Sequence, residues 1–399
     1  MIYADNAATT RISDTAFEKM LPFLRERYGN ASSQYSLGIT ARKAIEAARQ
    51  RVSDAIGAKV HEVIFTSGGS EANSWVLRGI AESFRGETIH VITSSIEHHS
   101  VLNACHALES EGTNVTYLPV SRSGVVEIDS VKKAISPNTK LVSIMLANNE
   151  IGTIQPIVEI GQFLREKDIL FHTDAVQAVG HIPVDVNKLC VDFLSASAHK
   201  FNGAKGTGFL YRRSVSKLPQ LIFGGEQEHG QRAGTENIAG VVALSFALNE
   251  SLTGMVEVQK RLESLVTLTA EGLRTSIPGI QINGEGVSRL PGTLNVTFPR
   301  ASGESMMHLL DLKGICVSTS SACNSGKDEP SHVLLALGLT AEQAKSSIRI
   351  SYGRYNTIED AETIVDNIRK VNAKIESLIS NARFKSTGFQ PVSFEQVFW

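Results

Sequence analysis

Residues 193–200 read Phe-Leu-Ser-Ala-Ser-Ala-His-Lys, an apolar start followed by small residues and a final lysine, Lys200. A similar pattern occurs upstream, where residues 171–177 read FHTDAVQ after an apolar run. Both patterns predict a short buried strand. The strand in the upstream stretch ends at Asp174, and the strand in residues 193–200 ends at Lys200. Open α/β sheets bind ligands in a crevice at the carboxyl ends of neighbouring strands. We therefore expect the Lys200 amine and the Asp174 carboxylate to face one ligand.

Similar short apolar runs recur along the first half of the chain. Helix-like segments separate many of them; in residues 41–56, for example, apolar side chains recur at helical spacing before Gly57. Strands that alternate with helices predict an α/β fold with a mostly parallel sheet covered on both faces. The predicted strands of this sheet are residues 62–66, 90–93, 141–146, 169–172, 193–195 and 208–211.

The pattern changes after a long polar helix predicted at about residues 254–276. Strand-like runs and a last helix at roughly 358–380 then predict a smaller α+β domain. These runs are residues 280–282, 293–298, 314–318 and 348–351. We predict a large domain at 15–256, a small domain formed by 1–14 and 257–380, and an aromatic tail at 381–399 that either docks on the body or is disordered.

The bulk composition excludes several classes of protein. The chain has 399 residues, of which 42% are hydrophobic and 20% charged, and its net charge is −2. This near-neutral balance gives no basic field, so we expect no direct binding to nucleic acid and none to a membrane. The first ten residues lack the basic and apolar regions of a signal peptide, and no apolar run approaches the roughly 18 residues of a membrane span. We expect a cytoplasmic protein.

The four cysteines contain no Cys-x-x-Cys pair, so reduced thiols are expected rather than disulfides or a zinc site. Cys105, Cys190 and Cys316 lie among apolar neighbours and are expected to pack. Cys323 instead lies in the small, polar stretch 318–330. We expect its thiol to be exposed, which reactivity requires.

A glycine-rich turn follows the predicted strand at 62–66, where residues 66–73 read TSGGSEAN and open a helix. Glycines let backbone N–H groups approach a phosphate, the helix N-terminus favours negative charge, and Ser70 adds a hydroxyl donor. Such a turn alone is often only a tight loop. Here it belongs to the sheet that also carries Asp174 and Lys200.

Two adjacent histidines, His98 and His99, follow the next strand. Their spacing, taken with Glu97 or His172, matches no zinc motif, so no metal site is predicted. His98 is interpreted as a ring that stacks on a cofactor and moves protons, with a solvent-facing histidine as the alternative.

Two further positions suggest contacts to a carboxylate. Asn149 ends another predicted strand, where it either caps a turn or binds the cofactor or substrate. Arg349 alternates with two isoleucines on a strand, and its planar guanidinium suits a substrate carboxylate. Arg354 competes for that role.

An amine and a carboxylate in one crevice are the groups that pyridoxal phosphate (PLP) requires. The lysine forms a Schiff base with the aldehyde, and the aspartate keeps the ring nitrogen protonated so that the ring accepts electrons.

In combination, the motifs resemble the cysteine desulfurases of the NifS/IscS type, within the class V, fold-type I PLP-dependent enzymes. The resemblance runs from the N-terminus to about residue 380. It implies a seven-stranded large-domain sheet, PLP as cofactor, and a homodimer with its active site at the subunit interface. The motifs that carry it are DNAATT at 5–10, TSGGSEAN at 66–73, EH at 97–98, NNEIG at 148–152, DAVQ at 174–177, SAHK at 197–200, RAGTEN at 232–237 and SAC at 321–323.

The resemblance also implies roles for individual residues. Lys200 holds the cofactor, and Cys323 accepts sulfur as a persulfide. His98 stacks on the ring, and Arg349 orients the substrate carboxylate together with Asn149. The remaining cofactor contacts are Asp174 at the ring nitrogen, Gln177 at the ring hydroxyl, and Gly69, Ser70, Ser197, His199 and the partner's Thr235 at the phosphate.

The reaction implied is conversion of L-cysteine to L-alanine, with sulfur passing through Cys323 to an acceptor protein. Iron–sulfur cluster assembly, tRNA thiolation and DNA phosphorothioation are all compatible destinations. One alternative is a selenocysteine lyase or another class V enzyme. The other is a partner-binding scaffold without catalytic activity, which would need neither Lys200 nor a cofactor.

Overall fold

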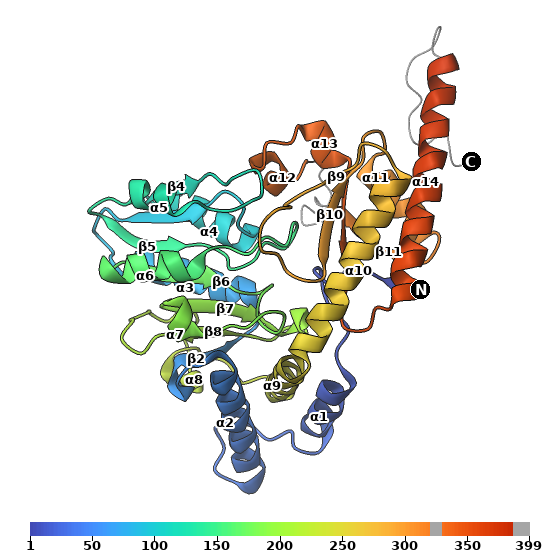
Figure 1. Cartoon of the computed structure of the whole chain (residues 1–399). Coiled ribbons are helices and arrows are strands. Elements are labelled where there is room, and N and C mark those ends of the chain that lie inside the picture. The colour runs from blue at the N-terminus through green and yellow to red at the C-terminus, as the bar shows by residue number, and fades with distance from the viewer. Residues whose placement is uncertain (320–328, 386–399) are drawn as a thin grey trace.

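The computed structural model describes residues 1–319 and 329–385, with only the backbone described within 380–385. Its centre is a seven-stranded sheet in the order β2-β8-β7-β6-β5-β3-β4 (Figure 1). Only β8 runs antiparallel to its neighbours; the other pairs are parallel, which confirms the predicted mostly parallel sheet. The strands are β2 (Val63–Thr66), β3 (His90–Ser94), β4 (Asn114–Leu118), β5 (Thr139–Ser143), β6 (Leu170–Asp174), β7 (Phe193–Ser197) and β8 (Gly208–Arg212).

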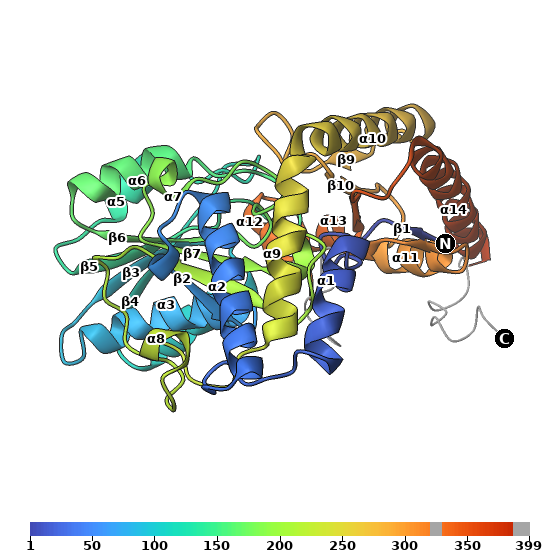
Figure 2. The ribbon, with the colours of Figure 1, turned by 90° about the horizontal axis from the view of Figure 1, so that it is seen from below.

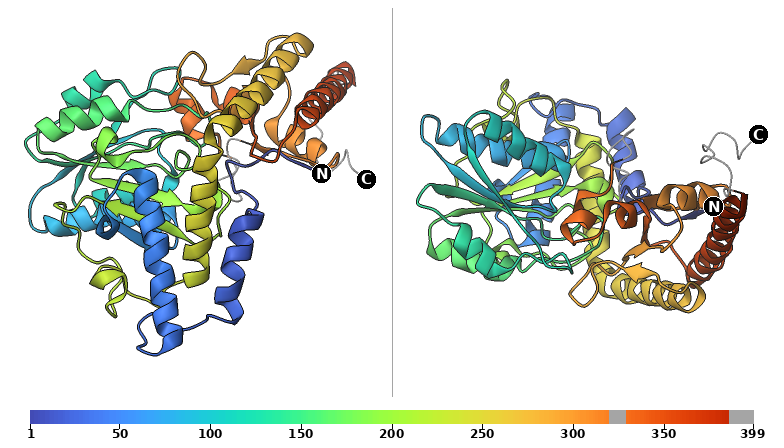
Figure 3. Two further views of the ribbon diagram at one scale, coloured as in Figure 1. Left: turned by 60° about the horizontal axis from the view of Figure 1, so that its bottom comes forward. Right: turned by 90° about the horizontal axis from the view of Figure 1, so that it is seen from above.

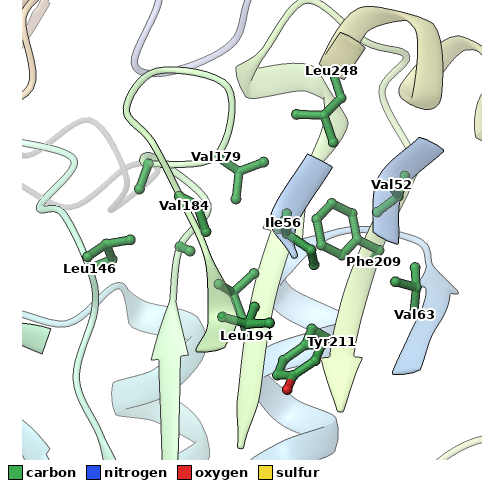
Figure 4. Close-up of a cluster of buried hydrophobic side chains, with 14 of the residues drawn as sticks. Val52, Ile56, Val63, Leu146, Val179, Val184, Leu194, Phe209, Tyr211 and Leu248 are labelled. Carbon is green, nitrogen blue, oxygen red and sulfur yellow. The ribbon is translucent and has the colours of Figure 1, made fainter. Parts of the chain in front are cut away.

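Helices cover both faces of this sheet (Figure 2). On one face, α3 (Gly69–Ser83) and α4 (His99–Ser110) pack side chains such as Trp75 against Phe193 and Leu210. The other face is covered by α2 (Ser36–Ile56), α5 (Ile128–Ala134), α6 (Ile157–Glu166) and α9 (Ile238–Thr253). Figure 4 shows part of this second core, in which Ile56 lies beside Phe209. Burial on both faces explains why the central strands read as continuous apolar runs.

Strand β4 was not predicted. It lies at the edge of the sheet and is buried only at Leu118, while Asn114 is exposed. An edge strand with one neighbour has no need of a continuous apolar run, so its sequence carried no clear signal.

The small domain has its own core (Figures 1 and 3). Helices α10 (Met255–Ser276), α11 (Gly303–Asp311) and α14 (Ile358–Lys385) pack against an antiparallel sheet in the order β12-β13-β10-β9. The strands are β9 (Gln281–Ile282), β10 (Thr293–Thr297), β12 (Ser318–Thr319) and β13 (Ser347–Ser351). Helix α14 continues past the predicted end at 380, and residues 386–399 of the aromatic tail lie outside the described residues.

The N-terminus connects the two domains. Strand β1 (Ile2–Tyr3) pairs in parallel with β11 (Ile315–Cys316) of the small domain. The chain then crosses to the large domain, where the backbone N–H of Thr10 donates to the carbonyl of His199 at 2.9 Å. Residues 5–9 therefore run past the carboxyl ends of the central strands.

The remaining helices are short or peripheral. They are α1 (Asp14–Arg25), α7 (Val186–Leu189), α8 (Gln227–Gly230), α12 (His332–Ala336), α13 (Ala341–Lys345), η1 (Val60–Glu62) and η2 (Ala198–Lys200). Among the described residues no single helix has the length and apolar character of a membrane span. The consecutive helices α9 and α10 pass that test only together, across a bend of 73°, and α9 is largely buried in the core.

Candidate active site

A cavity of about 750 Å³ opens at the carboxyl ends of β6 and β7, between the large-domain sheet and the small domain. Its walls come from elements far apart in the sequence, including residues 5–9, the start of α3 and strand β13. The structure thus brings together ten of the residues that the sequence analysis selected. They are Gly69, Ser70, His98, Asn149, Asp174, Gln177, Ser197, His199, Lys200 and Arg349.

Lys200 closes the short helix η2 directly after β7. Its Nζ donates to the backbone carbonyls of Ala7 at 2.6 Å and Ala8 at 2.8 Å. Gln177 donates to the same Ala7 carbonyl through Nε2 at 2.9 Å. The N-terminal segment therefore supplies the acceptors that hold Lys200 and Gln177 at the cavity.

Asp174 is the last residue of β6 and is buried. One carboxylate oxygen, Oδ1, accepts from the backbone N–H of Val176 at 2.9 Å. The other, Oδ2, accepts from Nδ2 of Asn73 at 2.7 Å. These two hydrogen bonds hold the Asp174 carboxylate in one orientation at the cavity.

The glycine turn lies at the start of α3. Gly68 is the N-cap residue, and its φ of +152° belongs to a region that glycine adopts readily and other residues avoid. A Cβ atom on Gly69 would stand 2.5 Å from Cγ2 of Val176, so this position admits no side chain. The cap has no side chain to satisfy the first-turn N–H groups of α3, which leaves them for an anion in the cavity.

Ser197 and His199 face the turn from the end of β7. Nδ1 of His199 lies 3.1 Å from Oγ1 of Thr9. Burial, together with the nearby charges of Lys200 and Lys205, lowers the pKa of His199 to about 4. The ring is therefore neutral at physiological pH.

His98 is the N-cap residue of α4 and lines the cavity. Nδ1 of its ring accepts from the backbone N–H of Ser100 at 3.1 Å and lies 2.8 Å from Oγ of Ser100. Burial lowers the pKa of His98, which keeps the ring neutral. His99 lies outside the cavity, and its ring packs edge-on against His332 at 4.7 Å between centroids.

Arg349 projects from the middle of β13 and is buried. One terminal nitrogen pairs with Oδ1 of Asp5 at 2.7 Å, and the other donates to the carbonyl of Asn149 at 2.9 Å. Its Nε is buried and has no hydrogen-bond partner among the described residues. Arg354, the competing candidate, pairs with Glu250 at 3.0 Å and does not line the cavity.

Of the other two predicted site residues, one lies outside this cavity and the other outside the described residues. Thr235 is exposed and is not among the residues that line the cavity of its own chain. Its loop is anchored to the large domain by two ion pairs, Arg232 with Glu71 at 2.9 Å and Arg49 with Glu228 at 2.6 Å. Cys323 lies outside the described residues; the nearest described strand, β12, contributes Ser318 to the cavity.

Sequence reasoning assigned no role to several groups that the structure places at the site. Asp5 and the carbonyls of Ala7 and Ala8 belong to a motif that carried the resemblance, but their contacts join residues more than 190 positions apart. Asn73 and Ser100 lie within helical segments and looked like ordinary polar helix residues. Asn73 also ends the TSGGSEAN motif, which was the one signal that pointed to it, and Ser100 carried none.

Comparisons with known proteins agree with this geometry. The class-V aminotransferase family model matches residues 2–364. Cysteine desulfurase IscS of Methanosarcina thermophila is 48% identical over 377 residues, which are 94% of this chain and 93% of that protein.

Solved structures give the same result. One described as a NifS-like protein has a TM-score of 0.88 at 39% identity and covers 93% of this chain and 99% of its own. A structure of SspA in complex with cysteine has a TM-score of 0.80 at 37% identity, with coverages of 90% and 100%. The chain therefore belongs to the class-V aminotransferase family and, within it, to the cysteine desulfurases of the IscS and NifS type.

Proposed function

We propose that this protein is a PLP-dependent cysteine desulfurase that acts as a cytoplasmic homodimer. It converts L-cysteine to L-alanine and passes the sulfur through Cys323 to an acceptor protein. The observation that carries the proposal is the meeting of Lys200, Asp174 and Arg349 in one cavity. The similarity to SspA, whose structure is a complex with cysteine, supports L-cysteine as the substrate.

The residues present fit PLP. The phosphate suits the turn at Gly68 and Gly69, where a Cβ would fill the space and the first-turn N–H groups of α3 lack a side-chain cap. Ser70, Ser197 and the neutral His199 line the same cavity and offer further hydrogen-bond donors. The carboxylate of Asp174 suits a protonated ring nitrogen, and Gln177 suits the ring hydroxyl.

When bound, PLP supplies an electron sink that stabilises negative charge on the α-carbon of an amino acid. Lys200 attaches the cofactor, and its amine then takes the proton from the α-carbon of the substrate. Asp174 would accept a hydrogen bond from a protonated ring nitrogen, since its buried carboxylate lines the same cavity as Lys200. His98 is placed to exchange a proton with the substrate.

Arg349 is proposed to bind the substrate carboxylate. Its guanidinium is buried, is held in place by Asp5 and the Asn149 carbonyl, and has its Nε unpartnered among the described residues. A buried N–H without a partner is costly, so a carboxylate that accepts from it binds favourably. Asn149 lines the cavity beside it and is proposed as a second contact.

The sulfur transfer is a nucleophilic step at the substrate sulfur. The Cys323 thiolate forms an S–S bond to that sulfur while the Cβ–S bond of the substrate breaks. The electron pair of the broken bond remains with the carbon skeleton, and Cβ gains a proton to become the methyl group of alanine. The products are alanine and a persulfide on Cys323, so the thiol hydrogens of both cysteines are accounted for.

We propose that the small domain, residues 1–14 and 257–380, carries this nucleophile. Ser318 lines the cavity, and Cys323 follows it by five residues. Five extended residues span at most about 18 Å. The covalent tether therefore keeps the thiol within reach of the cavity.

An exposed apolar surface supports the homodimer. Phe17, Leu21 and Leu24 lie on one side of α1 at helical spacing and are exposed, as are Tyr28 and Tyr35 just beyond this helix. A stripe of this kind on a soluble enzyme is typical of a protein interface. Thr235 is also exposed on its anchored loop, as expected for a residue that completes the site of a second copy.

The test is to incubate the PLP-loaded enzyme with L-cysteine and to measure both alanine and the mass of the Cys323 peptide. We expect alanine release and a gain of one sulfur atom on that peptide. Cys323→Ser should keep the bound cofactor but lose about 100-fold or more in alanine formation. Cys190→Ser, a partly exposed thiol outside the cavity, is the matched control and should behave as wild type.

The same experiment separates the alternatives. A Cys323→Ser enzyme that releases alanine at the wild-type rate would favour a selenocysteine lyase or another class V activity without a persulfide. A wild-type protein that binds no PLP would favour the non-catalytic scaffold.

A further inference from the structure

A continuous chain of hydrogen bonds joins Asp174 to His98 through two residues that have no role in the proposed function so far. Nδ2 of Asn73, on α3, lies 2.7 Å from Oδ2 of Asp174 and 2.9 Å from Oγ of Ser100. Oγ of Ser100, on α4, lies 2.8 Å from Nδ1 of His98. Asn73 is buried, and all four residues line the cavity.

The direction of every bond in this chain follows from chemistry. An amide nitrogen only donates, and Asn73 uses its two N–H groups on Asp174 and Ser100. The opposite orientation of the amide would place its oxygen 2.7 Å from a carboxylate oxygen, where both atoms are acceptors. The other amide atom, Oδ1, has no partner among the described residues, so nothing there favours the reversed orientation.

The direction of the Asn73–Ser100 hydrogen bond also determines that of the Ser100–His98 hydrogen bond. Its hydroxyl accepts from Asn73, so the single O–H proton is left to donate to Nδ1 of His98. The backbone N–H of Ser100 also donates to Nδ1, at 3.1 Å. A ring nitrogen that accepts two donors carries a lone pair, so the proton of the neutral ring lies on Nε2.

We propose that Asn73 and Ser100 are positioning residues that fix the tautomer of His98 with Nε2–H toward the cavity and hold Asp174 as an acceptor. This inference rests on the proposed function, because it assigns the state in which His98 and Asp174 meet cofactor and substrate. Nε2 has no hydrogen-bond partner among the described residues and is the nitrogen available to a bound molecule. The same two residues thus hold a proton donor at the start of α4 and a hydrogen-bond acceptor at the end of β6.

The charged and titratable groups around His98 come from three elements. Asp174 on β6 raises the pKa of His98, whereas Lys200 on η2 and His99 on α4 lower it, and burial lowers it most. The Ser100 hydroxyl adds a donor to Nδ1 and therefore favours the neutral ring. Removing that hydroxyl leaves all of these charges in place.

The test uses the full-length enzyme labelled with ¹⁵N in its histidine rings, with and without PLP. The His98 signals are identified as those missing from a His98→Gln variant. In the wild type we expect an unprotonated Nδ1 and a protonated Nε2. In Ser100→Ala the backbone N–H still caps the ring, but the pKa of His98 should rise by about half a unit to one unit, the shift that one lost hydrogen bond produces.

Two further variants keep the test decisive. Ser95→Ala makes the same chemical change in the turn between β3 and α4, at a hydroxyl without a partner among the described residues, and should leave the His98 signals unchanged. Ser100→Thr keeps the hydroxyl and should keep the wild-type pKa. An unchanged pKa in Ser100→Ala, or a protonated Nδ1 in the wild type, would overturn the inference.

Failure of this inference is distinguishable from failure of the proposed function. The ring signals are measured whether or not alanine forms. If wild-type enzyme releases alanine but Ser100→Ala leaves His98 unchanged, only the positioning role is wrong. If no alanine forms, the proposed function is wrong regardless of the tautomer.

Discussion

The cavity has two sides that are built in different ways. The sheet side consists of Asn73, His98, Asp174, Ser197 and Lys200, which sit at strand ends or helix starts of the large domain. The small-domain side consists of Arg349 and Ser318, with residues Asp5, Ala7, Ala8 and Thr9 of the N-terminal segment between the two sides. On the sheet side, side chains are fixed by bonds within the chain, such as those from Asn73 to Asp174 and from Lys200 to Ala7.

The small-domain side is incomplete by comparison. Arg349 keeps a buried Nε without a partner among the described residues, and the segment with Cys323 begins just beyond β12. The difference separates the groups proposed to hold the cofactor from those proposed to bind the substrate. The groups proposed to hold a cofactor are hydrogen-bonded within the chain, whereas Arg349, proposed to bind the substrate carboxylate, keeps one N–H that a ligand could use.

Lys200→Ala is expected to have the largest effect, because it removes the group of the sheet side that is proposed to attach the cofactor and to move the α-proton. Alanine formation should fall by about 1000-fold, within the range that a positioned acid–base group contributes. The measurement is alanine release by the PLP-loaded enzyme together with its visible absorption band. The band of a Schiff base to the protein should be absent in this variant.

The matched control for this variant is Lys188→Ala. Lys188 is an exposed lysine on α7, with only a weak contact to Asp185 at 3.9 Å. We expect its rate and spectrum to equal those of the wild type. A Lys200→Ala enzyme that kept most of its activity would show that the sheet side does not hold the cofactor.

The same comparison explains what the sequence could and could not predict. Asp174 ends the buried strand β6, and the strand predicted to end at Lys200 ends at Ser197, with Lys200 three residues later in η2. A strand buried on both faces is recognisable in the sequence as an apolar run. The glycine turn is also recognisable in the sequence. Gly68 has a φ of +152°, and a Cβ on Gly69 would clash with Val176, so both positions require glycine. The sheet side was therefore largely predictable, together with the fold.

What could not be predicted depends on contacts between distant segments. The pairing of Asp5 with Arg349 joins residues 344 positions apart, and a local pattern carries no information about it. Asn149 was selected for its side chain, yet its carbonyl is the atom that binds Arg349. Ser100 looks like any polar residue in the first turn of a helix until α3 places Asn73 beside it.

Arg349→Lys tests the small-domain side of the cavity. We expect a smaller effect on the enzyme than that of Lys200→Ala. A lysine keeps the charge but lacks Nε and the planar fork, so it cannot hold Asp5, the Asn149 carbonyl and a substrate carboxylate at once. Loss of one hydrogen bond to a charged group, worth about 1.5–3 kcal/mol, should raise KM for L-cysteine by about 10- to 100-fold. Steady-state kinetics at saturating PLP measure this change.

Arg354→Lys is the matched control, since Arg354 was the rival candidate. Its partner is Glu250, and it lies outside the cavity. We expect KM to change less than about twofold. A larger effect for Arg354 than for Arg349 would reverse the assignment and place the substrate carboxylate elsewhere.

The last prediction concerns stability rather than activity, and its residue, Glu97, lies between β3 and α4 and does not line the cavity. Its side chain is buried beside β5 and accepts from the backbone N–H of Met145, while its backbone carbonyl lies 2.9 Å from Nε2 of His332, which follows the Cys323 segment. Burial, with a smaller contribution from Asp174, raises the pKa of Glu97 from the ordinary 4.5 to about 8. The folded protein therefore binds a proton that the unfolded chain has already released at intermediate pH.

This shift fixes the sign of a pH effect on stability. The contribution of Glu97 is fully present below pH 4.5 and is lost as the pH rises through about 8. Within that window the free energy of unfolding should fall by up to about 1.4 kcal/mol per pH unit, the slope of one proton. Urea unfolding of Glu97→Gln, which cannot ionise, should show a flatter slope, whereas Glu111→Gln at an exposed ion pair should keep the wild-type slope. An equal slope in wild type and Glu97→Gln would mean that the Glu97 carboxyl is ionised in the folded protein, as a buried charge.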